Sequence, residues 1–414
     1  MEMNSNDYVT RVVEGATGLP ATDWDDLLAL QDQPTPFMRH AYLSALETSG
    51  SAKASIGWTP RFLTLWRGDQ LEAACPLYLK DHSYGEYVFD WAWADAYQRH
   101  GLAYYPKALC AVPFTPVPGS RLLARSDAGR LALVRALIAW SQAEALSSLH
   151  LLFLSPADLR ACEAAGLMAR HTVQFHWSNR VGPGPRQGAA ASEAAPGGGT
   201  PAGPYPDFDT FLGALSQDKR KKIRQERRKV AEAGITFRAA EGAEISQPEW
   251  EFFYRCYART YREHGNPPYL RPAFFEAMAS DLAESWVLFI AERAGEPIAC
   301  SLVGVDRANG VAWGRYWGAL ERVDCLHFEA CYYQPLQWCI ANGFGRFEGG
   351  AQGEHKMARA LMPVPTSSAH WLAHPTFSDA VQRFLEREGE GIEGYLTRLE
   401  SRTPFKRDGV PTAD

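Results

Sequence analysis

The stretch WVLFIAERAGEPIACSLVGV, residues 286–305, has the clearest strand pattern in this chain. It consists of two apolar runs, 286–292 and 297–305, separated by the short turn 293–296 with its glycine. Two such runs around a glycine-containing turn predict a β-hairpin. A hairpin of this kind is the start of a sheet, so the neighbouring residues must supply further strands and the helices that cover them.

The residues after the hairpin extend it into a larger unit. The tryptophan-containing run 311–317 predicts a third strand, 327–341 has the apolar periodicity of an amphipathic helix, and 345–348 predicts a last strand. The order of elements in this half of the chain is therefore hairpin, strand, helix and strand. Such an order favours a mixed sheet with helices packed against it.

The first half of the chain shows the same order of elements. Its predicted strands are 61–66, 71–79, 88–93 and 149–154, and its predicted helix is 127–145. A unit that occurs twice in one order argues for two related domains.

A segment of unusual composition separates the two halves. Residues 181–204 read VGPGPRQGAAASEAAPGGGTPAGP and contain almost only glycine, proline, alanine and small polar residues. Such a segment buries too little apolar surface to offset the entropy of ordering. We therefore predict a first domain over 1–180, a disordered linker over 181–204 and a second domain over 205–414.

The composition limits the class of protein. Of the 414 residues, 46% are hydrophobic and 22% charged, and the formal net charge is −6, so the chain has no overall attraction to nucleic acid or anionic lipid. We find neither an N-terminal signal pattern nor the run of about 18 apolar residues that a transmembrane helix needs. The eight cysteines are scattered without a CxxC pair, as in reduced proteins. These features predict a cytoplasmic protein without a transmembrane segment.

The densest group of chemically active residues is EGGAQGEHKMAR, residues 348–359, which follows the last predicted strand. It contains three candidate general bases and three candidate substrate-binding residues: Glu348, Glu354 and His355, and Gln352, Lys356 and Arg359. A strand end that enters a glycine-rich loop is where α/β enzymes usually hold their active site. The alternative is structural, with Glu348, Lys356 and Arg359 forming an ion-pair network that pins the loop.

These residue types suit N-acyl transfer. The reaction needs a base for the attacking amine, donors for the oxyanion and groups that hold the carrier's phosphates. Histidine titrates nearest neutrality and glutamate only after burial raises its pKa, so all three base candidates stay open. The peptide NH groups of 349–353 suit an oxyanion, and Lys356 and Arg359 suit a phosphate or carboxylate.

A cationic run, KRKKIRQERRK, occupies residues 219–229 and is predicted to be a helix that ends before Gly234. Its cations project all round the helix, which is more than one amphipathic face requires. The sequence predicts phosphate or tRNA binding through Arg220, Lys221, Lys222 and Arg224. A solvated helix without a ligand is the alternative.

Two weaker signals concern substrate contacts and metals. We expect Trp91, Asp95 and Trp317 to contact substrate, although aromatic packing with a capping aspartate is an equal alternative for the first two. Cys325, His327 and Cys331 lie close in sequence, but no second ligand pair follows at zinc spacing, so a core helix is favoured over a metal site.

Long motifs in both halves carry a family resemblance. They are WAWADAY (91–97), PFTPVPGSR (113–121), HFEACYY (327–333), EGGAQGEHKMAR (348–359) and PVPTSSAHW (363–371). On these motifs the chain resembles the FemAB-like predicted N-acyltransferases, which are related to the Fem-type aminoacyltransferases of peptidoglycan synthesis. The resemblance covers most of the chain outside the linker and the termini.

The resemblance implies an α/β (α+β) fold of two tandem GNAT-like domains, each with a mixed, mostly antiparallel sheet flanked by helices. It implies transfer of an acyl or aminoacyl group from a carrier to an amine acceptor, by direct attack in an interdomain cleft, with a link to peptidoglycan metabolism. Acyl-CoA and aminoacyl-tRNA are both candidate co-substrates, and no tightly bound cofactor is expected. Residues 318–327 lack the glycine-rich coenzyme A signature of GNAT enzymes. An acetyl-CoA-dependent acetyltransferase and a non-catalytic binding protein remain the alternatives.

Overall fold

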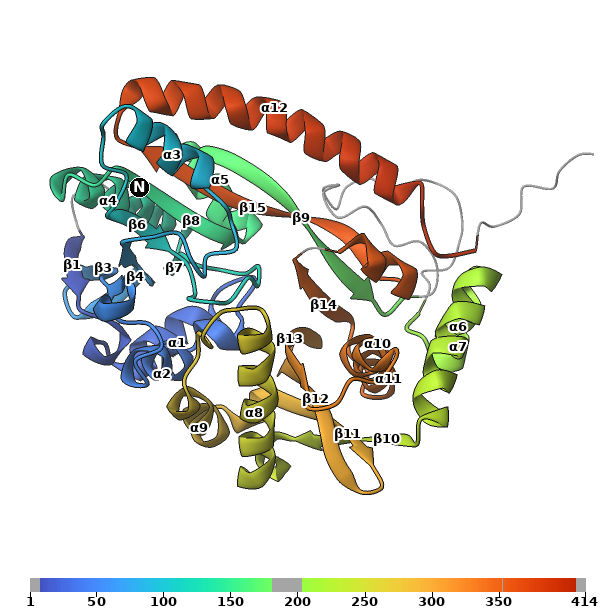
Figure 1. The fold of residues 1–414 in the computed structure, drawn as a ribbon. Helices are drawn as coiled ribbons and strands as arrows, with labels where there is room; N and C mark the ends of the chain where they lie inside the picture. The colour runs from blue at the N-terminus through green and yellow to red at the C-terminus, as the bar shows by residue number, and fades with distance from the viewer. Residues whose placement is uncertain (1–7, 181–202, 352, 407–414) are drawn as a thin grey trace, which may run out of the picture. The chain divides into compact units, whose positions relative to one another are not determined.

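The computed structural model describes residues 8–180, 203–351 and 353–406 (Figure 1). The chain forms two compact units. The first consists of Met1–Thr172, Tyr269–Leu282 and Pro365–Gly394, and the second of Val173–Pro268, Ala283–Val364 and Tyr395–Asp414. Each unit therefore combines segments that lie far apart in the sequence, which a division by chain order does not anticipate. The predicted linker 181–204 lies outside the described residues up to position 202.

The second unit is built on a mixed sheet. Its strands, in spatial order, are β10 (Ile235–Glu241), β11 (Trp286–Arg293), β12 (Glu296–Asp306), β13 (Val311–Ala319), β14 (Arg346–Ala351) and the end of β9 (Met168–Ser178). Neighbours are antiparallel except β13 and β14, which are parallel. Ala294 and Gly295 both have positive φ in the turn between β11 and β12, as two-residue hairpin turns require. The hairpin and the strands predicted at 311–317 and 345–348 are confirmed.

Helices cover both faces of this sheet (Figure 1). On one face lies α8 (Gln247–Glu263), which begins with a capping box formed by Ser246 and Glu249. A methyl group on Gly318 of β13 would lie 2.2 Å from the carbonyl oxygen of Cys256 in α8, so only glycine permits this approach. On the other face the apolar core includes Trp177, Phe347 and Leu336. The elements on that side are α6 (Phe208–Ala214), α7 (Gln217–Glu232), α10 (Leu326–Phe328) and α11 (Gln334–Ala341).

The helix predicted at 327–341 is confirmed, but its centre departs from α-helical geometry. Between α10 and α11 the residues Glu329–Tyr333 form a π-helix. Pro335 explains the change, because proline has no N–H to donate and its ring clashes with the carbonyl four residues earlier. Widening the preceding turn accommodates the ring, and such π segments occur frequently at functional sites.

The first unit contains two groups of strands. One is a sheet in the order β1 (Val9–Val13), β3 (Phe62–Arg67), β4 (Gln70–Cys75) and β7 (Leu123–Ala124). The other runs from the second part of β15 (Met362–Leu372) through β8 (Ser148–Leu154), β6 (Lys107–Cys110) and β5 (Tyr78–Lys80) to β2 (Trp58–Pro60). The strands predicted at 61–66 and 149–154 are confirmed, but the strand predicted at 71–79 is split. Pro76 lies between β4 and β5 and cannot donate to a ladder.

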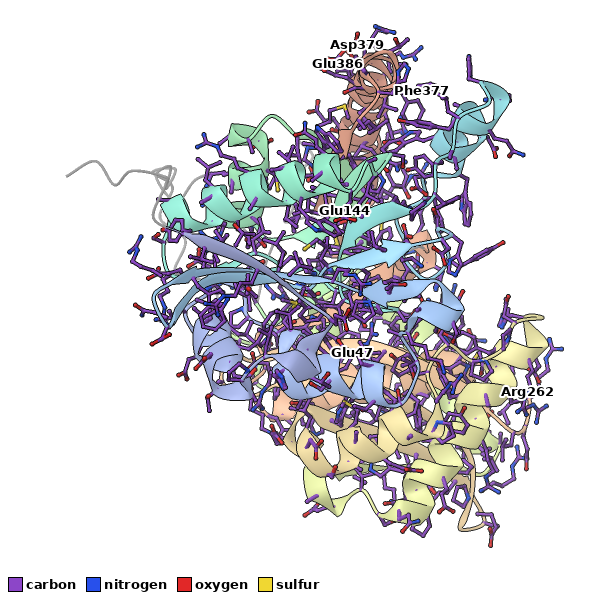
Figure 2. All side chains as sticks on the ribbon, turned by 90° about the vertical axis from the view of Figure 1, so that its left-hand side faces the viewer. Glu47, Glu144, Arg262, Phe377, Asp379 and Glu386 are labelled. Atoms are coloured by element: carbon purple, nitrogen blue, oxygen red, sulfur yellow. The ribbon has the colours of Figure 1, made fainter. Side chains whose placement is uncertain are left out.

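Helices surround these strands. They are α1 (Ala21–Ala29), α2 (His40–Thr48), α3 (Trp91–Arg99), α4 (Asp127–Ala143), α5 (Pro156–Ala164), α9 (Pro272–Asp281) and most of α12 (Pro375–Glu400). Glu47 of α2 accepts the N–H of Ala16 at 2.8 Å. Figure 2 shows Phe377 of α12 directed toward α3, and its ring lies 4.2 Å from that of Tyr97. The helix predicted at 127–145 is confirmed as α4.

The strand predicted at 88–93 is wrong, because α3 begins at Trp91. The aromatic residues in this stretch follow helical spacing, since Trp93 and Tyr97 are buried while Trp91 is exposed. The place of the predicted strand in the repeat is taken by β7, which pairs antiparallel with β4 as β13 does with β12. Within the described part of the chain, no helix has both the length and the apolar character that crossing a membrane requires.

Candidate functional site

The sheet of the second unit opens between its two parallel strands. β13 and β14 pair at three positions only, the last being Trp313 with Glu348. The register of β12 and β13 shifts beside this point, between Leu302 and Val303, and such a bulge bends and twists a strand. The two parallel strands therefore diverge beyond Trp313 and Glu348 and leave a gap in the sheet.

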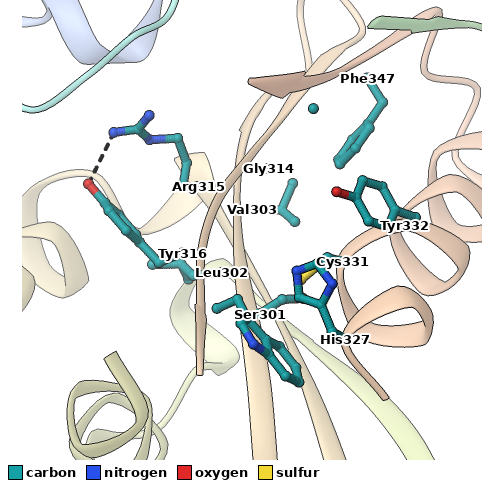
Figure 3. A pocket seen from close by; sticks show the side chains of 12 residues that line it. Ser301, Leu302, Val303, Gly314, Arg315, Tyr316, His327, Cys331, Tyr332 and Phe347 are labelled. Atoms are coloured by element: carbon teal, nitrogen blue, oxygen red, sulfur yellow. Dashed lines mark hydrogen bonds between the residues drawn. The ribbon is translucent and has the colours of Figure 1, made fainter. Parts of the chain in front are cut away.

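A pocket lies in this gap on the side of α10 and the π-helix (Figure 3). It encloses about 160 Å³, less than the roughly 300 Å³ at which pockets for drug-sized ligands begin. Its lining comprises Ser301, Leu302, Val303, Gly314, Arg315, Tyr316, Trp317, His327, Cys331, Tyr332, Phe347 and Gly349. The size suits a small group, such as an acyl chain or an amino acid, and not a whole carrier.

Two polar side chains of the pocket wall are neutral near pH 7. Burial lowers the pKa of His327 to about 4, with help from the charges of His355 and Arg359. Burial also raises the pKa of the Tyr332 hydroxyl, and this hydroxyl lies 3.5 Å from Nε2 of His355. A tyrosine that stays protonated can donate its proton to a group in the pocket.

Glu348 lies at the same gap on the opposite face of β14. Successive strand residues face opposite sides, so Phe347 and Gly349 border the pocket while Glu348 faces away from it. The side chain of Glu348 is buried, with Oε1 2.9 Å from Nε of Arg346. Burial raises the pKa of Glu348 to about 7, against the opposing effects of Arg346 and a hydrogen bond from Trp313. A carboxyl with this pKa can both take and release a proton at neutral pH.

Sequence reasoning missed His176 as a neighbour of Glu348. His176 is opposite Glu348 in the pairing of β9 with β14, and its Nε2 lies 3.8 Å from Oε2 of Glu348 and 3.1 Å from Oε1 of Gln174. Burial lowers the pKa of His176 to about 3, so the ring is neutral. The one feature of the sequence that could have identified His176 is that it is a polar residue between Phe175 and Trp177.

The glycine-rich loop is held by Lys356. Its ammonium donates to the carbonyl oxygens of Gly349 and Gly350 at 2.6 and 3.2 Å, and burial lowers its pKa to about 8. A methyl group on Gly349 would lie 2.3 Å from the side chain of Leu361, so glycine is needed here. Lys356 therefore contacts loop carbonyls, and the predicted role in substrate binding stays a prediction.

The other residues of the loop have different surroundings. Glu354 is exposed and accepts the hydroxyl of Tyr395 at 3.0 Å, and His355 is exposed beside Tyr332. Arg359 is buried and pairs with Glu226 of α7 at 2.9 Å. Gln352 lies outside the described residues. Of the three base candidates, Glu348 alone combines burial with a raised pKa.

The remaining predicted contacts divide between the two units. Trp317 lines the pocket, with its ring 5.4 Å from that of His327. Trp91 and Asp95 are exposed on α3 of the first unit. His327 and Cys331, considered for a metal, form part of the pocket wall, and the described residues contain no group of three or more His, Cys, Asp and Glu side chains that could hold a metal ion.

The predicted cationic helix is confirmed as α7. Lys221, Lys222 and Arg224 are exposed and Arg220 is half-buried. Arg224 lies 3.9 Å from Asp209, and Arg220 donates to the carbonyl of Gly213 at 3.4 Å. Lys221 and Lys222 form no ion pair with any described residue, so their charges face solvent.

A profile of the FemAB-like family, described as peptidoglycan biosynthesis/recognition, matches residues 16–182 and 202–407. The chain belongs to the FemAB-like family. The match covers nearly all of the sequence, so the resemblance drawn from the motifs is confirmed. A comparison with curated proteins gives no match.

Solved structures show the same fold as this FemAB-like chain. A C-terminal domain from Agrobacterium fabrum, described as that of a candidate lysylphosphatidylglycerol synthetase, is 11% identical with TM-score 0.50, over 87% of this chain and 94% of that one. FemX is 10% identical with TM-score 0.50, and the match covers 88% of this chain and 98% of FemX. L-PGS from Bacillus licheniformis is 10% identical with TM-score 0.50, and the match covers 88% of this chain and 97% of L-PGS. The predicted fold of two tandem GNAT-like domains is confirmed.

Proposed function

We propose that this FemAB-like protein is an N-acyltransferase that moves an acyl or aminoacyl group from a carrier to an amine. One observation carries the proposal: the gap between β13 and β14 has a small pocket on one face and the buried carboxyl of Glu348 on the other. An acyl group held in the pocket and an amine beside Glu348 would meet across the strands.

The reaction is direct aminolysis. The amine nitrogen attacks the acyl carbon, a C–N bond forms, and the C–O or C–S bond to the carrier breaks. Glu348 takes the proton that the amine loses, and its pKa of about 7 suits this transfer at neutral pH. Tyr332 is protonated and lines the pocket, so it can donate a proton to the leaving oxygen or sulfur. The proton on Glu348 then passes to solvent, and the Tyr332 phenolate takes a proton back from solvent, which restores both groups.

The comparisons support the direction of this proposal. The family description names peptidoglycan biosynthesis or recognition, and one structural neighbour is described as part of a candidate lysylphosphatidylglycerol synthetase. We therefore propose an amine of a peptidoglycan precursor as the acceptor.

The carrier is proposed to be an aminoacyl-tRNA, with acyl-CoA as the alternative. The exposed cations Lys221, Lys222 and Arg224 suit a polyanion. The turn before α10 weighs against coenzyme A, because Gly318 is already packed against Cys256 and no other glycine precedes the helix in 318–327. A tRNA carrier would place the reaction in the cytoplasm.

The test measures transfer of labelled amino acid from aminoacyl-tRNA, or labelled acetyl from acetyl-CoA, to a soluble precursor peptide with a free side-chain amine. We expect transfer from the tRNA by the wild type and loss of turnover by at least about a hundredfold in Glu348→Gln. Glu354→Gln is the matched comparison, because it removes an exposed carboxylate six positions away.

The outcomes separate the candidate functions. Transfer from acetyl-CoA alone would identify an acetyltransferase. Binding of the peptide without any transfer would identify a binding protein. Full activity of Glu348→Gln would show that another residue is the base.

A further inference from the structure

α7 has one buried charge on its inner face. The helix exposes Lys221, Lys222 and Arg224 to solvent and buries Ile223, Glu226 and Val230. Glu226 is buried, with its side chain 9% exposed, and two side chains bind the same carboxylate oxygen. Nη2 of Arg359 donates to this oxygen at 2.9 Å. The hydroxyl of Tyr333 donates to it as well.

The π-helix is attached to α7 at both of its ends. Tyr333, its last residue, donates to Glu226. Glu329, its first residue, accepts Nε of Arg227 at 3.1 Å. Two successive residues of α7 therefore hold the two ends of the segment that carries Cys331 and Tyr332 in the pocket wall.

The same carboxylate fixes a second segment beside the pocket. Arg359 donates through Nη1 to the carbonyl oxygen of His355 at 2.9 Å, and its guanidinium lies 3.5 Å from the ring centre of Phe328. Nε2 of His355 lies 3.5 Å from the Tyr332 hydroxyl. Glu226 is therefore connected to this hydroxyl in two ways: through Tyr333, the neighbour of Tyr332 in the π-helix, and through Arg359, which binds the carbonyl of His355.

We propose that Glu226 is a positioning residue that fixes Tyr332 and His355 against the cationic helix α7. This inference rests on the proposed function for its kinetic consequence, because Tyr332 is the suggested proton donor. A buried ion pair contributes little net stability but penalises any arrangement that separates its partners, so it suits a geometric role. A carrier bound to the outer face of α7 would then be aligned with the pocket through the helix itself.

The first test needs no substrate and follows the thiol of Cys331, which is half-buried in the π-helix. Its rate of alkylation by N-ethylmaleimide is read by mass spectrometry, with the buried Cys339 of α11 as internal reference. In Glu226→Gln we expect labelling of Cys331 about tenfold faster through local opening, with Cys339 unchanged. Glu232→Gln is the matched control, because Glu232 is exposed on the same helix.

The second test separates kcat from KM in the transfer assay. Glu226→Gln should lower kcat about tenfold or more and leave the KM for the carrier within twofold, because it removes a constraint on the transition state and no contact to the carrier. Glu226→Asp keeps the charge and should restore part of kcat. If Glu226→Gln does not fold, Tyr333→Phe replaces it, since it removes one hydroxyl and leaves the pair of Glu226 with Arg359.

The results distinguish this proposal from the proposed function. Faster labelling at Cys331 alone, in a protein whose wild type transfers nothing, would keep the positioning role and reject the transferase. If the alkylation rates of Cys331 and Cys339 rose equally in Glu226→Gln and its melting temperature fell, Glu226 would only stabilise the fold. Unchanged labelling and unchanged kcat in a folded Glu226→Gln would overturn the proposal.

Discussion

Replacing Glu348 by glutamine should make the protein more stable at alkaline pH while it removes activity. Glu348 is buried, and its pKa is raised from 4.5 to about 7. A carboxyl with a higher pKa in the folded chain binds its proton more tightly there than in the unfolded chain. The free energy of unfolding therefore falls as pH rises from about 4.5 to about 7 and stays at the lower level above it.

The size of this effect follows from the two pKa values. Their difference, at about 1.4 kcal/mol for each pKa unit, corresponds to about 3 kcal/mol. Glutamine has the same shape and no charge, so Glu348→Gln avoids this cost at every pH. Arg346 loses its partner, but its side chain is 35% exposed and stays hydrated. We expect a variant about 3 kcal/mol more stable than the wild type at pH 8 and nearly equal to it at pH 4.5.

The assay is urea unfolding followed by tryptophan fluorescence, at a series of pH values between 4.5 and 8.5. Glu354→Gln serves as the control, and because Glu354 is exposed its difference from the wild type should not follow this curve. A Glu348→Gln variant less stable than the wild type at pH 8 would refute the reasoning. A stability difference independent of pH would do so as well, because it would show that the Glu348 carboxyl has its ordinary pKa.

Three further predictions concern packing, acid stability and charge. Gly318→Ala places a methyl group 2.2 Å from a backbone oxygen of α8 and should cost about 3 kcal/mol in urea unfolding. His150 is buried, and burial is the main cause that lowers its pKa to about 3. The free energy of unfolding of the first unit should therefore fall as pH drops below about 6.5, where the unfolded histidine gains a proton. His150→Gln should make this free energy depend less on pH. The double change Lys221→Ala and Lys222→Ala should weaken tRNA binding and reduce its salt dependence by about two charges.

Each of these predictions has a result that contradicts it. An unchanged unfolding midpoint for Gly318→Ala would mean that α8 is not closely packed on β13. Acid unfolding that is identical in His150→Gln would assign the pH dependence to other groups. Equal salt dependence in the double lysine variant would show that a tRNA, if bound, contacts another surface.

Local sequence predicted the hairpin, the elements that follow it and the cationic helix of the second unit, but not β10 or α8. The hairpin 286–305 follows from two apolar runs and a turn in which Ala294 and Gly295 take positive φ, and α7 follows from a run of good helix formers. Local signals were misleading where one residue type suits two structures. In 88–93 the aromatics resembled a strand, but the burial of Trp93 and Tyr97 at a spacing of four is helical.

Family motifs located the residues around Glu348 but not their partners. Glu348 and His176 are far apart in the chain, and the pairing of β9 with β14 alone brings them opposite each other. Arg359 was predicted to bind substrate or to form an ion pair that pins the loop, and its partner, Glu226, lies on a helix far away in the sequence. The pKa of Glu348 depends on burial, which no local pattern shows.

Local patterns and motifs therefore predicted many of the elements, the family and the loop that was expected to hold the site. The tertiary structure alone decided which face of β14 holds the pocket, which carboxyl is buried and which cations stay in solvent. The physical reason is the distance along the sequence over which each interaction acts. Turn geometry and helix periodicity are set by residues within a few positions of one another, whereas desolvation and ion pairing are set by whatever the fold places alongside.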